Sequence, residues 1–375
     1  MSIRQMFLGS IVKPGFNPLA APTPTYLYNL FSWGSGATGR LGLNNTTTYS
    51  SPKQVGALTN WISVVAGYNN SAAIKTDGTL WTWGGSNNGQ LGLGNTTEYS
   101  SPKQVGALTA WLKITSKYRS VLSIKTDGTL WAWGSNTQGQ LGLGNTTAYS
   151  SPKQVGALTN WLNVNLGTSF ALATKTDGTL WAWGRNNNGC LGINNTASYS
   201  SPKQVGALTT WLKVAGGYRF SMAIKTDGTL WTWGQGAGGM LGLGNTTDYS
   251  SPKQVGALTT WLNISAGNYF STAVKTDGTM WVWGTNGDGQ LGLGNTTSYS
   301  SPKQVGALTN WSKNACGNYN IEVIKTDGTL WGWGRNNSGQ LGLGNATVYS
   351  SPKQVGTSTT WLDVACGPYH TLALG

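Results

Sequence analysis

The chain has 375 residues and a formal net charge of +13, although only 9% of its residues are charged. The lysines recur at fixed repeat positions, so we expect a solvated rim around the molecule and not the basic stripe of a nucleic-acid groove. Three cysteines and one histidine are too few for a disulfide framework, a histidine metal cluster or an assignable Ser-His-Asp triad. We therefore expect no cofactor, no metal and no enzymatic activity.

Residues 1–25 precede the repeats and combine a short apolar patch with several prolines. The apolar run is too short for a secretory signal or a transmembrane helix, so we expect no membrane insertion. One interpretation is a disordered leader. We favour a docking arm that attaches the molecule to a partner through its apolar side chains, namely Met6, Phe7, Leu8, Ile11, Val12 and Phe16.

From Tyr26 onward one pattern returns every 50 residues, which indicates a repeat architecture. The second copy predicts four strands, at Trp61 to Ala66, Asn70 to Lys75, Thr79 to Gly84 and Pro102 to Val105. Asp77-Gly78 is expected to supply the positive φ angles of a tight hairpin turn. The tryptophans that recur in these strands are expected to form the core.

The chain starts with the second half of a unit and stops with the first half. Seven complete four-stranded sheets result if the C-terminal strands join the N-terminal ones, and this closure removes the exposed edges of an open array. The sequence therefore predicts an all-β fold, a seven-bladed β-propeller over residues 26–375, closed by pairing of its two ends.

The phrase Gly-x-Tyr-His-x-x-x-Leu at 367–374 and the repeated Trp-x-Trp-Gly-x-Asn-x-x-Gly-Gln-Leu-Gly resemble the regulator of chromosome condensation repeat. The resemblance covers residues 26–375 and implies a seven-bladed propeller clasped in this manner. Members of that family serve as exchange factors, scaffolds, enzyme partners and binding modules. The near-identical copies and the opening residues also resemble bacterial and tailed-bacteriophage versions.

Several features of the family are missing here. The family histidine is present only as His370; the equivalent positions hold Asn70, Ser120, Phe170, Phe220, Phe270 and Asn320. The wedge insertion and the basic nuclear tail of the eukaryotic exchange factor are also absent from the sequence. These departures argue against guanine-nucleotide exchange on chromatin.

Differences between the copies gather in two loops, one after the first strand and one after the Trp-x-Trp strand. In an up-and-down blade both loops emerge at the same end, so the variation is predicted to lie on one face. Tyr, Asn, Ser, Gly and Arg dominate these loops, as in adaptable recognition surfaces, although loop drift would give the same pattern. The predicted recognition residues are Tyr68, Asn69, Tyr118, Arg119, Tyr218, Arg219, Tyr269, Tyr319, Tyr369, Arg185, Asn187, Arg335 and Asn337.

The leading prediction from these observations is a non-enzymatic phage virion protein, on a tail fibre or capsid surface. Residues 1–25 would contact other virion proteins, and the variable loops would bind a host surface glycan or protein. The first alternative is a protein-binding scaffold of the same family in the bacterial cytoplasm. A remote alternative is a propeller lyase or hydrolase. No specific nucleic-acid partner is predicted.

Overall fold

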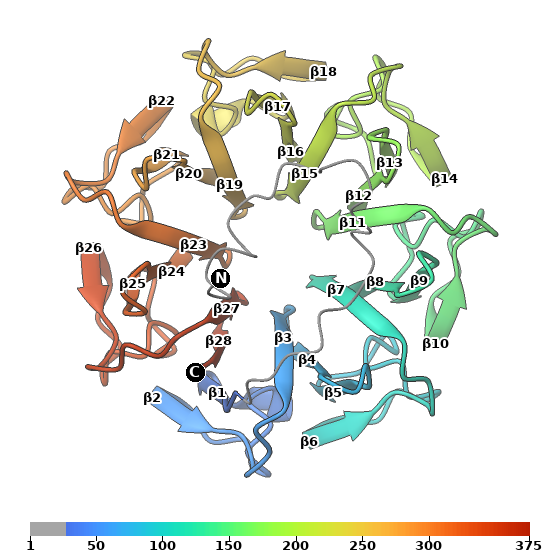
Figure 1. Cartoon of the computed structure of the whole chain (residues 1–375), viewed down its shortest axis with the longest axis vertical. Coiled ribbons are helices and arrows are strands. Elements are labelled where there is room, and N and C mark those ends of the chain that lie inside the picture. The colour runs from blue at the N-terminus through green and yellow to red at the C-terminus, as the bar shows by residue number, and fades with distance from the viewer. Residues whose placement is uncertain (1–27) are drawn as a thin grey trace, which may run out of the picture.

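Each 50-residue repeat folds into one four-stranded antiparallel sheet. In the computed structural model, which describes residues 28–375, seven such sheets stand radially around a central channel (Figure 1). The predicted attachment arm lies outside the described residues. Within residues 28–375, no helix is long and apolar enough to cross a membrane.

Twenty-eight strands and two single-turn 3-10 segments, η2 (Ala37–Gly39) and η3 (Ala237–Gly239), make up the described secondary structure. The strands are β1 (Leu30–Gly34), β2 (Tyr49–Gln54), β3 (Trp61–Ala66), β4 (Asn70–Lys75), β5 (Leu80–Gly84), β6 (Tyr99–Gln104), β7 (Trp111–Lys117), β8 (Ser120–Lys125), β9 (Leu130–Gly134), β10 (Tyr149–Gln154), β11 (Trp161–Leu166), β12 (Phe170–Lys175), β13 (Leu180–Gly184), β14 (Tyr199–Gln204), β15 (Trp211–Gly216), β16 (Phe220–Lys225), β17 (Leu230–Gly234), β18 (Tyr249–Gln254), β19 (Trp261–Ala266), β20 (Phe270–Lys275), β21 (Met280–Gly284), β22 (Tyr299–Gln304), β23 (Trp311–Cys316), β24 (Asn320–Lys325), β25 (Leu330–Gly334), β26 (Tyr349–Gln354), β27 (Asp363–Cys366) and β28 (His370–Leu374).

Ring closure takes place within one sheet, whose strand order is β2-β1-β28-β27. β1 pairs antiparallel with β28, from Leu30 opposite Leu374 to Gly34 opposite His370. Backbone hydrogen bonds continue beyond the strands, since Asn29 N donates to Gly375 O over 3.0 Å. The predicted seven-bladed propeller and its closure are therefore confirmed, and all seven blades have four strands.

The fourth strand of each blade begins three residues earlier than predicted. In the second blade β6 runs from Tyr99 to Gln104, with Gly84 opposite Tyr99 and Trp81 opposite Gln104. The register shifts between Thr82 and Gly84, so a bulge lies in the pairing. Pro102 is tolerated because β6 is the outermost strand, where a missing N–H costs no hydrogen bond to a further strand.

The core lies between neighbouring blades. Each hydrophobic cluster combines side chains from two consecutive sheets, as Leu372 and Leu374 do with Trp61 and Trp83. Trp83 Nε1 donates to Arg40 O of the preceding blade over 2.9 Å. The same hydrogen bond from an indole N–H to a carbonyl of the preceding blade recurs in all seven blades. The other donors are Trp33, Trp133, Trp183, Trp233, Trp283 and Trp333.

A second inter-blade contact runs along the inner strands. Lys113 Nζ donates to Leu162 O of the next blade over 2.7 Å, and Asn163 continues the ladder to Leu212 O. Lys213, Asn263 and Lys313 repeat the arrangement in the following blades. Polar side chains at this repeat position therefore fix the spacing of blades around the channel.

The residues of the Asp-Gly turns make hydrogen bonds and close contacts within the fold, which is a physical reason for their identical sequence in each copy. Only Gly78 of the pair has a positive φ, +76°, so the expectation of two such angles is wrong. The Asp77 carboxylate accepts hydrogen bonds from the Thr79 N–H and hydroxyl. A Cβ on Gly78 would lie 1.8 Å from Thr109 O, so the turn packs directly against the following segment.

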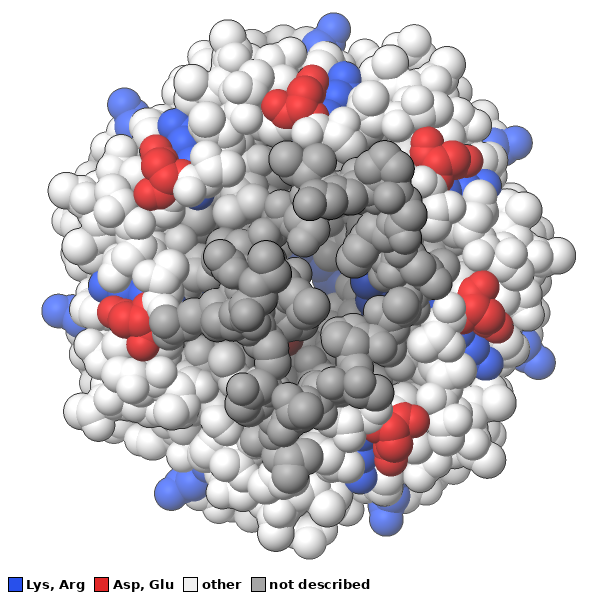
Figure 2. All heavy atoms as spheres, in the orientation of Figure 1, with Lys and Arg blue, Asp and Glu red and all other residues white. Residues whose placement is uncertain are grey.

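The lysines divide into two groups. Lys53 is exposed, in agreement with a solvated rim. Lys75 is only 6% exposed, and its Nζ lies 3.9 Å from the ring centroid of Trp81 and 5.0 Å from that of Trp61. For the Lys75 series the rim prediction is wrong, because the ammonium packs on two indole faces. On the face seen in Figure 2, acidic side chains lie beside basic ones around the ring.

Candidate recognition face

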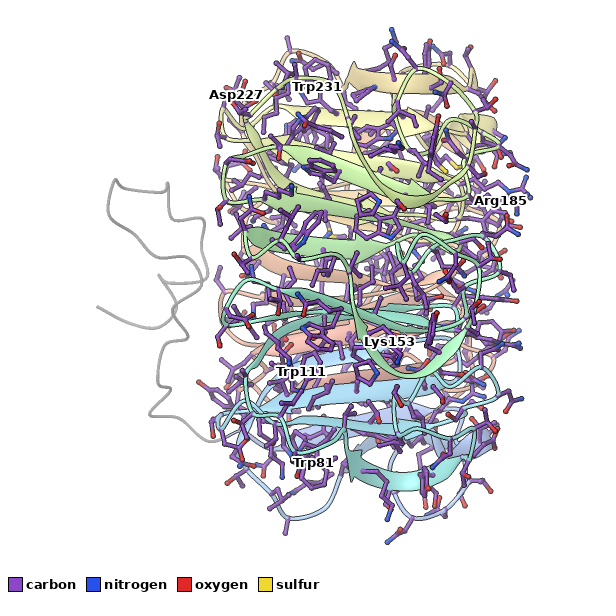
Figure 3. The ribbon with its side chains drawn as sticks, turned by 90° about the vertical axis from the view of Figure 1, so that its right-hand side faces the viewer. Trp81, Trp111, Lys153, Arg185, Asp227 and Trp231 are labelled. Atoms are coloured by element: carbon purple, nitrogen blue, oxygen red, sulfur yellow. The ribbon has the colours of Figure 1, made fainter. Side chains whose placement is uncertain are left out.

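The two variable loops of each blade lie together on one side of the ring, which we call the variable face. In the second blade these are residues 67–69 and 85–88, and Gly85 N donates to Asn69 O, which joins the two loops. Figure 3 shows Arg185, from the second loop of its blade, on the side opposite to Asp227, from an Asp-Gly turn. Loop variation and constant turns therefore occupy opposite faces.

All six predicted tyrosines form two arcs on the variable face. In the first tyrosine arc (Tyr369, Tyr68 and Tyr118), ring centroids lie 5.5 Å and 5.2 Å apart. The Tyr68 and Tyr369 hydroxyls are 3.4 Å apart, and this hydrogen bond raises the pKa of Tyr68. The second tyrosine arc (Tyr218, Tyr269 and Tyr319) has centroid separations of 5.2 Å and 6.1 Å.

Arginines stack on these tyrosines. The guanidinium carbons of Arg119 and Arg219 lie 5.5 Å and 4.8 Å from the centroids of the adjacent Tyr118 and Tyr218. Arg119 donates to Asn88 Oδ1, and Arg219 donates to the Tyr218 hydroxyl. The result is a belt of stacked tyrosine rings and arginine guanidinium groups. Both residue types are enriched at protein interfaces.

Sequence reasoning missed Arg40, which lies 5.6 Å above Tyr369 and donates to Tyr68 O. Burial lowers the pKa of Arg40 from its usual value. Arg40 replaces the glutamine found at this repeat position in four other copies, Gln90, Gln140, Gln290 and Gln340. That substitution was the only signal that could have found it.

The predicted asparagines have different environments. Asn69 is only 7% exposed, and its side-chain oxygen accepts a hydrogen bond from Gln90, so it links the two loops of its blade and is not available to a partner. Asn187 and Asn337 are exposed on the second loops of their blades. Asn187 and Arg185 line a cavity of about 210 Å³, whereas the structure pairs Arg335 with Asp288 over 3.0 Å.

The cavity lies where the belt of tyrosines is interrupted. Between Tyr118 and Tyr218 the equivalent residue is Thr168, whose small side chain leaves space between the two arcs. The other polar groups that line this space are Ser169, Arg185, Asn187, Asn188 and Arg219. No acidic residue is among the lining residues. The interruption therefore creates a basic, aromatic-walled hollow on the variable face.

Family models match most of the propeller. The RCC1-like domain matches residues 26–262, and models of the regulator of chromosome condensation (RCC1) repeat match 277–321 and 327–374 in one case and 261–290 and 313–340 in the other. The chain belongs to the RCC1-like family. No curated protein sequence matches it.

Solved RCC1-like propellers superimpose on this one at low sequence identity. Human WBSCR16 has a TM-score of 0.83 and 21% identity, over 92% of this chain and 98% of that one. Prp20p from Saccharomyces cerevisiae, described with its binding properties to Gsp1p and histones, has a TM-score of 0.83 and 18% identity, over 96% of each chain. Yeast RCC1 (Prp20) bound to Kap60 has a TM-score of 0.84 and 18% identity, over 97% and 94%. These likenesses concern the fold.

The single histidine of this RCC1-like chain is a packing residue. His370 is fully buried, and its Nε2 lies 2.9 Å from Ser71 Oγ. Ser71 donates its own proton to Arg40 O, which leaves the imidazole as donor to the serine oxygen. Burial lowers the pKa of His370 well below its usual value. A serine that donates to a carbonyl, beside a buried imidazole, is not arranged as a nucleophile and its base.

A lysine crosses the central channel of the propeller. Lys117 takes the place of a glycine that occurs at this position in the other six copies. Its Nζ donates to Gly216 O over 2.7 Å and to Ala266 O over 3.1 Å, two and three blades further round the ring. Burial lowers the pKa of Lys117 to about 8. The side chain therefore bridges walls of the channel, a cavity of about 480 Å³.

The thiols and carboxylates make no metal site. Within residues 28–375, no group of three or more His, Cys, Asp and Glu side chains is placed to hold a metal ion. Burial raises the pKa of the Cys190 thiol to about 12 and also raises the pKa of the Cys316 and Cys366 thiols. Thiols with raised pKa values are poor nucleophiles near neutral pH, in line with structural roles.

Proposed function

We propose that this RCC1-like propeller is a non-enzymatic protein-binding scaffold and that the variable face is its binding surface. The observation that carries the proposal is the belt of stacked tyrosines and arginines on that face. Tyrosine and arginine, with tryptophan, are the side chains that contribute most to binding energy at protein interfaces, because each offers a large rigid contact area and directional donors.

The comparisons support a protein partner. Prp20p is described as binding Gsp1p and histones, and yeast RCC1 was solved bound to Kap60. The virion role predicted from the leader and from the phage resemblance finds no support among these solved propellers, which come from human and yeast. We therefore adopt the scaffold, the first alternative from the sequence. Attachment through residues 1–25 stays a prediction.

The test compares variants of the two faces. Tyr68→Ala and Tyr269→Ala together remove one ring from each tyrosine arc. Thr168 and Ser169, the residues equivalent to Tyr68 and Tyr269, show that both positions tolerate a small side chain. Thr126→Ala and Thr176→Ala, at exposed positions beside the Asp-Gly turns, provide the matched control. A partner would be captured from cells of the source and identified by mass spectrometry. The affinity of the purified partner would then be measured for each variant.

Loss of two central aromatic rings should weaken binding of the purified partner by about thirtyfold or more, because one aromatic anchor contributes about 2 kcal/mol at an interface. The turn-face control should bind as the wild type does. If the turn-face variant loses the partner and the variable-face variant keeps it, the proposed surface is the wrong one.

A further inference from the structure

We propose that the cavity around Arg185 is a binding site for a carboxylate, supplied by an aspartate or glutamate in an acidic segment of the partner protein. The inference deepens the proposed function and rests on it. The site lies between the two tyrosine arcs, with Tyr118 and Tyr218 as its flanking rings and Arg185 in its wall.

A second arginine at the same repeat position shows what Arg185 lacks. Arg335 is the equivalent of Arg185 three blades further on. Its Nε and one terminal nitrogen bind the two carboxylate oxygens of Asp288, over 3.2 Å and 3.0 Å. Its guanidinium also stacks 4.1 Å from the centroid of Tyr319. In that blade the protein itself supplies the carboxylate, in the two-pronged geometry that suits a guanidinium.

Both partners are replaced around Arg185. The residue equivalent to Asp288 is Gln138, and the residue equivalent to Tyr319 is Ser169. Gln138 is exposed and brings no charge. The substitutions remove the internal carboxylate and the ring that would fill the space, while the arginine is retained. The guanidinium of Arg185 therefore lines an open cavity without the carboxylate that pairs with Arg335.

The arginines of the cavity have unused donors. Nε of Arg185 and Nε of Arg219 are both buried, and neither has a hydrogen-bond partner among the described residues. A buried charged donor without a partner costs free energy, so its presence in a folded protein calls for an explanation. An incoming carboxylate would accept from Arg185 as Asp288 does from Arg335.

Size and lining favour a single side chain as the ligand. The cavity of about 210 Å³ is slightly larger than the cavity of about 150 Å³ that holds one benzene molecule. Thr168, Ser169 and Asn187 add hydrogen-bonding groups, and none of the lining residues is acidic. The nearby carboxylate of Asp248 is engaged by the lining residue Asn188, whose side-chain amide donates to it over 3.2 Å. Because Arg219 also lines the cavity, two guanidinium groups contribute positive charge at one small site.

The binding experiment uses a fluorescein-labelled oligoglutamate peptide, with the oligoglutamine peptide of equal length as the neutral reference, and reads fluorescence anisotropy. Arg185→Gln removes the site, and Arg335→Gln removes the same charge from the same repeat position. This control matters because a chain of net charge +13 attracts any polyanion. Arg185→Gln should weaken oligoglutamate binding by about tenfold or more, and Arg335→Gln by about twofold or less.

A second variant closes the site without removing the arginine. Gln138→Asp with Ser169→Tyr transplants the surroundings of Arg335 onto Arg185, and it should abolish the Arg185-dependent part of oligoglutamate binding. Equal losses for Arg185→Gln and Arg335→Gln would overturn the proposal, since they would show attraction by net charge alone. Tighter, Arg185-dependent binding of a phosphoserine peptide would overturn the carboxylate assignment in favour of a phosphate.

The identified partner separates this inference from the proposed function. If Arg185→Gln leaves the partner bound while Tyr68→Ala with Tyr269→Ala releases it, the carboxylate site is refuted and the scaffold proposal stands. If neither variant changes partner binding, both proposals fail together.

Discussion

Glu322 offers the sharpest test of how the blades pack. Its side chain is fully buried in β24, and both carboxylate oxygens are without a hydrogen-bond partner among the described residues. Gly332 on the neighbouring strand makes room for it, because a Cβ there would lie 2.6 Å from Glu322 Oε1. Burial raises the pKa of Glu322 well above its usual value of 4.5.

The direction of the pH effect follows from proton binding. In the unfolded chain Glu322 loses its proton near pH 4.5, whereas the folded protein retains it to higher pH. The folded state then binds more protons, so the free energy of unfolding falls as pH rises through this window, by about 1.4 kcal/mol per pH unit.

We expect Glu322→Gln to remove this pH dependence while preserving the shape of the side chain. Urea unfolding of both proteins at several pH values gives the difference in free energy, in which titration of all other groups cancels. The variant should gain on the wild type by about 1.4 kcal/mol per pH unit as pH rises above the usual pKa of a glutamate, for as long as folded Glu322 keeps its proton. A difference that does not change with pH would refute the reasoning, because it would mean that Glu322 titrates alike in both states.

Two further predictions concern ring closure and the channel. In urea unfolding, Gly342→Ala should destabilise the chain by roughly 2 kcal/mol more than Gly356→Ala. Both glycines have positive φ, but only a Cβ at Gly342 would meet Trp33, 2.8 Å from its Nε1. Equal losses of stability would contradict the close packing of Trp33 against the preceding blade. Lys117→Gly should remove a rise in stability between about pH 8 and pH 10.5, since the unfolded chain binds the lysine proton more tightly over that range. Parallel stability curves for wild type and variant would show that the ammonium is not desolvated in the channel.

Much of the blade could be predicted from the sequence because its signals are local. The predicted bounds of β3 and β4, Trp61–Ala66 and Asn70–Lys75, agree with the structure. The outer strand β6 was misplaced because its pairing passes a bulge, and Pro102 suggested a strand start where the structure has a strand interior. An edge strand receives hydrogen bonds from one side only and therefore accepts a proline in its interior, so Pro102 does not mark a strand end.

The environments of individual arginines and lysines could not be predicted, because residues at the same repeat position look alike in the sequence but have different contacts in the structure. Arg185 and Arg335 look equivalent in the sequence, yet only Arg335 has a carboxylate, and Asp288 reaches it from the preceding blade. Likewise, nothing in the residues around Lys117 indicates that its ammonium binds carbonyls two and three blades away. Side chains that meet across blades are separated by roughly whole repeats, beyond the range of local patterns.

The sequence by itself therefore determined the seven-bladed ring, its closure by the two ends, and the assembly of the variable loops on one face. These follow from the 50-residue period, turn chemistry and the half-unit offset of the termini, all of which are read along the chain. The tertiary structure alone decided which charges are neutralised, which are buried without a partner and where the belt of tyrosines opens into a cavity. Those outcomes depend on distances between blades, and electrostatic and packing energies are set by such distances rather than by sequence order.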